Sequence, residues 1–183
     1  MAAIALVLTV LITARRKKGR RRRSRRTRGT KVDSARSHVW RRESAARVFA
    51  MIRRGEMQPG QVLAYLRKID PLEFEEIVLL SLRSAGFTVK NRGRYTGDGG
   101  VDGEVSRSGV DYIVQCKRYS GSIAAKDVER LENECARRRC GGLFVHTGKT
   151  GKGSRQVVAK DWSRVKIISG DALVGLLTGK NLL

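Results

Sequence analysis

The sequence predicts an α/β protein in which helices cover both faces of a mixed central sheet. Short runs rich in β-branched and aromatic residues alternate with segments of helical periodicity, as in sheets with parallel strands. Two of these runs are joined by a short connection that contains Arg-Ser-Gly at 107–109, which indicates one antiparallel hairpin within the sheet. The 183 residues, 40% of them hydrophobic, suffice for one sizeable core. We therefore expect a single main domain with appendages.

The strands are expected where apolar runs are bounded by turn residues. They cover residues 87–90, 101–105, 111–119, 141–147 and 165–169. Within the run 111–119, the segment Ile-Val-Gln-Cys-Lys-Arg-Tyr at 113–119 begins apolar, so it is typical of an interior strand, where a lysine needs a partner or a ligand. This strand is the first place to look for chemistry.

The helices are expected from apolar residues at helical spacing. Residues 45–52 and 62–69 predict a helical hairpin around the breaker Gly-Glu-Met-Gln-Pro-Gly. Asp70 followed by Pro71 predicts a capped helix start, and this helix is expected to end at Gly86. Further helices are expected at 124–138, 154–160 and 171–177. These helices alternate with the last three strands, which completes the α/β pattern.

The first 31 residues form an appendage whose role has alternative interpretations. Residues 1–14 are uncharged and mostly apolar, and residues 15–31 carry 12 Lys or Arg and no acid. As a helix, the apolar run would span about 21 Å, short of a hydrocarbon core of about 30 Å. One reading is an anchor at the cytoplasmic face of the inner membrane, with the basic segment on an anionic lipid surface. The competing interpretations are an incorrectly assigned start codon, or an apolar tip on an extended, solvated basic tail of a cytoplasmic protein.

Charge and cysteine content narrow the class of partner. The net charge is +22, and residues 32–183 still carry +10 without the basic run, so a polyanion such as nucleic acid is the expected partner. The three cysteines include no CxxC pair, which indicates neither a disulfide framework nor a zinc site. The loop 147–154 lacks the spacing of a phosphate-binding P-loop. Lys149 and Lys152 in that loop are instead candidates to contact a DNA phosphate, the alternative being a solvated turn.

The hairpin brings three polar side chains within reach of one another. Gln115 and Lys117 are two positions apart on one strand and therefore share a face. Closing the hairpin at 107–109 places the strand with Asp102 beside them. A carboxylate and an amide oxygen on adjacent strands suit Mg²⁺, and an ammonium group beside them suits phosphodiester hydrolysis. Taken singly, Asp102 also fits a turn cap, and Gln115 with Lys117 also fits an edge strand.

Four segments in this order resemble the catalytic domain of Mrr-type restriction endonucleases, within the PD-(D/E)XK nuclease superfamily. They are FEEIVLLSLRSAGF, GDGGVDG, IVQCKRY and GGLFVHTG. The resemblance covers roughly residues 70–178, and it implies a restriction-endonuclease-like α/β/α core. The expected organisation is thus an apolar and basic tail at 1–31, a helical lead-in at 32–69 and a nuclease domain at 70–183.

The resemblance also implies roles for individual residues. Asp102 would be the main metal-binding carboxylate and Lys117 the catalytic lysine. Gln115 would be a second metal ligand where most of the superfamily has an acid, and Glu75 resembles the helical glutamate that such sites add. The implied function is a Mg²⁺- or Mn²⁺-dependent endonuclease that restricts foreign or modified double-stranded DNA, in the manner of type IV enzymes, and that works as a homodimer. The alternative is an inactive, nuclease-like DNA-binding protein, tethered to a membrane or free.

Overall fold

A computed structural model describes residues 31–92 and 100–180 of the chain. The expected apolar and basic tail lies outside these residues except for Lys31, where the first described helix begins. None of the described helices combines the length and the apolar character needed to cross a membrane. The expectation of an anchor at residues 1–14 concerns a part of the chain that the structure does not describe.

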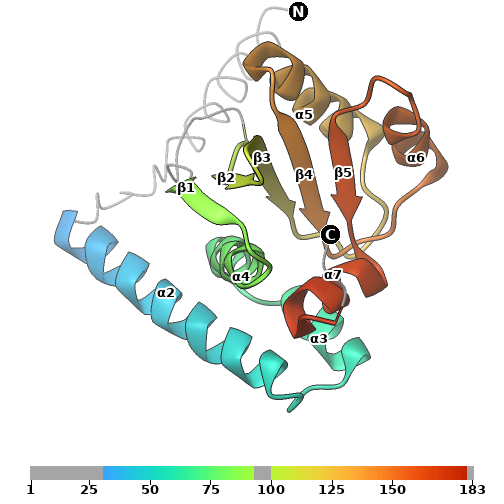
Figure 1. Ribbon diagram of the computed structural model, residues 1–183. Coiled ribbons are helices and arrows are strands. Elements are labelled where there is room, and N and C mark those ends of the chain that lie inside the picture. Colours follow the sequence, from blue (N-terminus) through green and yellow to red (C-terminus); the bar gives the residue numbers. More distant parts are fainter. Residues whose placement is uncertain (1–30, 93–99, 181–183) are drawn as a thin grey trace, which may run out of the picture. The chain divides into compact units, whose positions relative to one another are not determined.

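The predicted mixed sheet is confirmed, with five strands in the order β1-β2-β3-β4-β5 (Figure 1). The strands are β1 Thr88–Arg92, β2 Gly103–Arg107, β3 Val110–Lys117, β4 Gly141–His146 and β5 Val165–Ile168. The first three strands pair antiparallel, and β3, β4 and β5 pair parallel. The turn between β2 and β3 holds Ser108 and Gly109 at φ 51° and 79°, which suits a tight hairpin. In this order β3 is the central strand, as the apolar residues immediately before Gln115 indicate.

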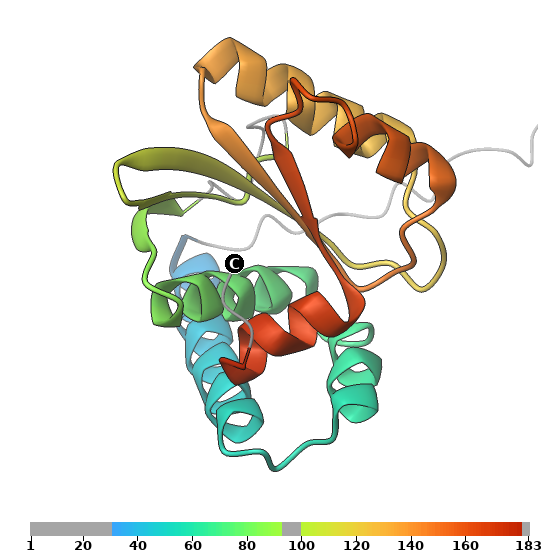
Figure 2. The same cartoon turned by 45° about the vertical axis from the view of Figure 1, so that its right-hand side comes forward.

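Helices cover both faces of this sheet (Figure 2). They are α2 Lys31–Arg53, α3 Pro59–Leu66, α4 Pro71–Ser84, α5 Ala125–Arg138, α6 Lys152–Val158 and α7 Gly170–Thr178. α5 and α6 lie on one face, and α4 and α7 lie on the other. Because β3, β4 and β5 are parallel, a crossover must join each to the next, and α5 and α6 are these crossovers.

Two hydrophobic clusters form the core, one on each face. The first contains Val114 and Cys116 of β3 with apolar residues of α2, α3, α4 and α7. The second contains Ile113 of β3 with apolar residues of α5, α6, β4 and β5. Side chains alternate along a strand, so Gln115 and Lys117 belong to the face that α5 covers. The helices ahead of residue 70 share the first core, and how the chain divides into domains stays a prediction.

The start of α4 is fixed by its cap and by the upstream helix. Asp70 Oδ1 accepts hydrogen bonds from the amides of Leu72 and Glu73 at 2.9 and 3.3 Å, which confirms the predicted N-cap. The same oxygen accepts a hydrogen bond from Arg41 Nε of α2 at 3.2 Å. Ser44, one turn further along α2, donates to the buried Glu73 at 2.6 Å. These polar contacts hold α2 against the helix that carries Glu75.

Candidate active site

The sequence-predicted residues Asp102, Gln115 and Lys117 lie where β2 begins and β3 ends. Gly103 pairs with Val114, and the Asp102 amide donates to the Val114 carbonyl at 2.8 Å, so Asp102 lies one step further along the same ladder, beside Gln115. Lys117 is the last residue of β3. The hairpin therefore brings the carboxylate and the two side chains of β3 to one edge of the sheet, as the strand pairing predicts.

Asp102 is held in a largely buried position next to Lys117. Its Oδ2 accepts a hydrogen bond from the Cys116 amide at 2.6 Å, and no described residue donates to its Oδ1. Burial raises the pKa of Asp102 to about 6, although the Cys116 hydrogen bond and the positive charge of Lys117 act in the opposite direction. Lys117 lowers this pKa because its positive charge favours the ionised carboxylate of Asp102. The two side chains therefore interact electrostatically. Asp102 thus keeps one carboxylate oxygen free for a cation.

Glu75 joins this environment from α4, on the other layer. Burial, together with the negative charges of Asp102 and Asp70, raises the pKa of Glu75 to about 8, although the positive charge of Lys117 acts in the opposite direction. At pH 7 the metal-free site therefore holds Asp102 mostly ionised and Glu75 mostly protonated. A divalent cation would offset the repulsion between the two carboxylates and displace the proton.

Gln115 presents an amide oxygen that lacks a partner. Its side chain is 6% exposed, and Oε1 has no hydrogen-bond partner among the described residues. The amide nitrogen lies against the backbone of Gly100, where a Cβ atom would collide with it. An unpaired buried carbonyl costs about 1–3 kcal/mol, so this oxygen favours a ligand that can satisfy it. The sequence hint for this contact is the glycine run before Val101.

We expect Gly100→Ala to lower the free energy of unfolding by about 2–4 kcal/mol, because it adds a collision with Gln115 to the strain of a φ of +87°. Thermal or urea unfolding measures the change. Gly55→Ala is the matched control, since Gly55 has a φ of +75° and no atom near its would-be Cβ. Equal costs at the two glycines would show that the close approach of Gln115 plays no part.

The donor set fits a hard divalent cation such as Mg²⁺. Asp102 and Gln115 offer oxygen atoms on adjacent strands, and Glu75 adds a second carboxylate that shares their charge environment. Across residues 31–92 and 100–180, no group of three or more His, Cys, Asp or Glu side chains is placed to hold a metal. Counting only these described residues, the site offers two acids and an amide, the type of open set that leaves positions for water and substrate.

Lys149 and Lys152 lie beyond the same edge of the sheet. Past Lys117 the chain runs beside the end of β4: Tyr119 N donates to Thr147 Oγ1 at 3.0 Å, and Thr147 Oγ1 donates to the Tyr119 carbonyl at 2.9 Å. A further parallel bridge joins residues 122 and 149. Both lysines are exposed, and neither is among the charges that shift the pKa of Glu75 or Asp102. The structure thus places them near the site without bringing them into the carboxylate cluster.

In a comparison with protein families, the family Mrr_cat, described as restriction endonuclease, matches residues 66–177. No curated protein gives a significant match. Among solved structures, the chain is similar to the MspJI restriction endonuclease in complex with a 27-mer oligonucleotide, with 22% identity, a TM-score of 0.50 and 64% of this chain covered. It is also similar to the DNA modification-dependent restriction endonuclease AspBHI and to restriction endonuclease FokI, with identities of 22% and 16%, TM-scores of 0.48 and 0.47, and 66% and 67% of this chain covered.

The matched region spans only 30% of the MspJI chain, 35% of AspBHI and 28% of FokI. The similarity to MspJI shows the fold that the sequence predicts, a nuclease-like α/β core.

Proposed function

This chain belongs to the Mrr_cat restriction endonuclease family, and from that membership we propose that it is a metal-dependent endonuclease that hydrolyses phosphodiester bonds in double-stranded DNA. The observation that carries the proposal is the shared environment of Asp102, Glu75 and Lys117 at one edge of the sheet. Two acids and an ammonium group are the parts that this hydrolysis needs.

In the proposed mechanism, Asp102 and Gln115 hold a divalent cation, Mg²⁺ or Mn²⁺, with Glu75 close by. The bound ion would polarise the scissile phosphate and offset the charge that develops on it. Lys117 orients the attacking water and stabilises negative charge on the phosphate oxygens. Asp102 is kept in position by the Cys116 amide, so its free oxygen needs little rearrangement to bind. Lys149 and Lys152 contact DNA phosphates further along the backbone.

The biological role that we propose is restriction of foreign or modified DNA, as in type IV systems. The MspJI structure with an oligonucleotide and the modification dependence of AspBHI are properties of those proteins, and they motivate the proposal. Cleavage of both strands requires two sites or two visits, so we propose a homodimer. We further propose a cytoplasmic protein whose residues 1–31 attach it to the anionic inner face of a membrane.

Incubation of the purified full chain with supercoiled plasmid tests the activity. We expect nicked and linear products with Mg²⁺ or Mn²⁺ and none with EDTA. Because both acids must be ionised to bind the metal, and their pKa values are raised to about 6 and about 8, the rate should rise from pH 6 to pH 8 at subsaturating metal. Parallel substrates with and without methylated cytosine test the restriction of modified DNA.

The second candidate function is a nuclease-like DNA-binding protein without activity. The neutral Gln115 favours it, because an amide attracts a divalent cation less strongly than a carboxylate. DNA binding with no metal-dependent product at any pH from 6 to 9 would select this candidate over the endonuclease.

A further inference from the structure

The end of the sheet opposite Lys117 contains a groove of about 590 Å³. We call it the rear groove. It lies where β3, β4 and β5 begin, and its lining includes Val110, Tyr112, Gly141, Arg139, Arg164 and Lys166. Val110 in the lining of the groove and Lys117 in the candidate active site are the two ends of β3, which lie about 23 Å apart at about 3.3 Å per residue. The two features therefore occupy opposite edges of one sheet.

The floor of the rear groove depends on Gly141. A Cβ atom at this position would lie 2.5 Å from Tyr112 Cδ1, so the Tyr112 ring rests directly against the backbone where β4 begins. Val110 is 48% exposed beside it. The floor thus offers apolar and aromatic surface, and the rim supplies charge.

The rim is positively charged. Arg139, Arg164 and Lys166 are exposed, and no ion pair or side-chain hydrogen bond joins their side chains to another residue that the structure describes. The acid that lines the groove, Asp111, forms an ion pair with Lys90 Nζ at 2.5 Å. Three cations of the rim therefore have no ion-pair partner in the part of the chain that the structure describes.

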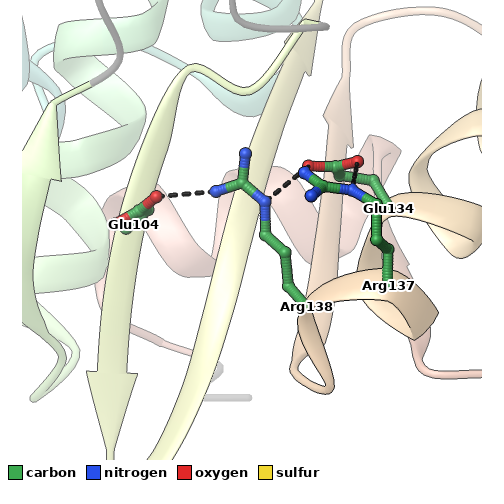
Figure 3. Close-up of polar contacts among 4 residues, drawn as sticks. All are labelled: Glu104, Glu134, Arg137 and Arg138. Carbon is green, nitrogen blue, oxygen red and sulfur yellow. Dashed lines mark hydrogen bonds and ion pairs between the residues drawn. The ribbon is translucent and has the colours of Figure 1, made fainter.

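The two arginines that precede Arg139 behave differently, and Figure 3 shows their ion pairs. Arg138 bridges Glu104 and Glu134, with an Nη1 to Oε1 distance of 2.7 Å to Glu104, and Arg137 also pairs with Glu134. Arg139 follows them directly, but it is the C-cap of α5 with a φ of 55°. This left-handed turn takes Arg139 out of the helix, and it lines the rear groove. Arg137 and Arg138 are thus paired with glutamates, whereas the charge of Arg139 is available to an anion in the groove.

We propose that the rear groove binds the phosphodiester backbone of a second DNA segment while the first lies at the active-site edge. This inference rests on the proposed function in one respect, that DNA is the partner. Three uncompensated cations around an open groove match a polyanion. Because DNA has a persistence length of about 150 base pairs, a duplex along one edge stays straight and does not fold back to the opposite edge. The protein would therefore bridge two DNA segments.

The test compares two triple variants of the full chain. The groove variant is Arg139→Gln with Arg164→Gln and Lys166→Gln. The control variant, Arg47→Gln with Lys160→Gln and Lys180→Gln, removes the same charge from exposed positions on or beside α2, α6 and α7. Both carry Lys117→Ala for the binding assays, so the DNA stays intact. Thermal unfolding confirms that the two variants fold equally well.

The first measurement is capture of a fluorescent duplex by protein bound to an immobilised duplex. We expect the groove variant to capture at least about five-fold less than the control variant. The second is the salt dependence of duplex binding: each lost phosphate contact lowers the slope of log K against log salt by about 0.9, so the groove variant should lose roughly 2–3 units relative to the control.

Equal capture and equal slopes for the two triple variants would overturn the inference, and would show that any bridging arises elsewhere, for example by dimerisation through the active-site edge. Polyglutamate binding that only the groove variant loses, with unchanged DNA capture, would overturn it in favour of an acidic protein partner. Groove-dependent capture would support the inference even if the Lys117-containing protein cuts no plasmid, because that result counts only against the proposed activity.

Discussion

Lys117→Ala should reduce the rate of metal-dependent plasmid cleavage by at least about 100-fold. The expected loss follows from removing a cation that acts on both Glu75 and Asp102 at this edge of the sheet. Lys117 lies at the end of a strand and is only partly buried, so the truncation should leave the fold intact. DNA binding should fall much less than cleavage, because many other cations remain. Single-turnover cleavage of a labelled duplex measures the loss in the chemical step.

Lys160→Ala is the matched control for this experiment. Lys160 is an exposed lysine that lies over the Trp162 ring at 4.8 Å, beside α6. It has the same charge and is remote in sequence from the site residues. We expect its variant to cleave at the wild-type rate. Persistent cleavage by a folded Lys117→Ala variant would mean that another group performs the role assigned to this lysine.

Asp102→Asn should abolish cleavage and, in the absence of metal, stabilise the protein. Asparagine is nearly isosteric and can still accept the Cys116 hydrogen bond, but it is a poor ligand for Mg²⁺. Burial raises the pKa of Asp102 from 3.8 to about 6, so the metal-free protein loses stability as the pH rises through this interval. Above pH 6 the ionised form carries the full cost, about 1–3 kcal/mol. The variant avoids this cost.

Thermal unfolding with and without divalent metal measures both effects. At pH 7.5 with EDTA, we expect the melting temperature of the variant to exceed that of the wild type by roughly 2–8 °C. At pH 4 the two should converge, since Asp102 is then protonated in the folded protein. Millimolar Mg²⁺ should raise the melting temperature of the wild type alone. Asp161→Asn, at an exposed position, should leave all of these values unchanged. A metal-induced shift retained by Asp102→Asn would remove Asp102 from the set of ligands.

Much of the fold can be predicted because local chemistry and tertiary packing agree. Asp70 with Pro71 marks the start of α4 in the sequence, and the structure shows the cap at that residue. Alternate side chains around Gln115 and Lys117 point to opposite faces of β3, as the two hydrophobic clusters show. The apolar residues immediately before Gln115 indicate the central place of this strand in the sheet. These features depend on residues that are close together in the sequence, so the sequence alone is enough to predict them.

Other features depend on contacts between residues that are distant in the sequence. The periodic apolar positions of the lead-in begin at Ala45, but α2 begins at Lys31 and makes polar bonds to Asp70 and Glu73 at the start of α4 ahead of that first apolar position. Periodicity does not reveal such bonds. The close approach of Gly100 to Gln115 and the raised pKa of Glu75 likewise arise from packing between elements. The rear groove is formed by the starts of three strands and the end of α5, so no single stretch of sequence indicates it.

The Asp70 carboxylate accepts hydrogen bonds both from the amides of α4 and from Arg41 of α2. The segment ahead of the family match therefore acts as a brace that holds α4 in position. A protease cut near Gly55, or translation from a later start codon, would leave the matched region whole in sequence while removing this brace. The helix that presents Glu75 would then be free to shift, and we expect the metal affinity of the proposed site to fall although no proposed ligand has changed.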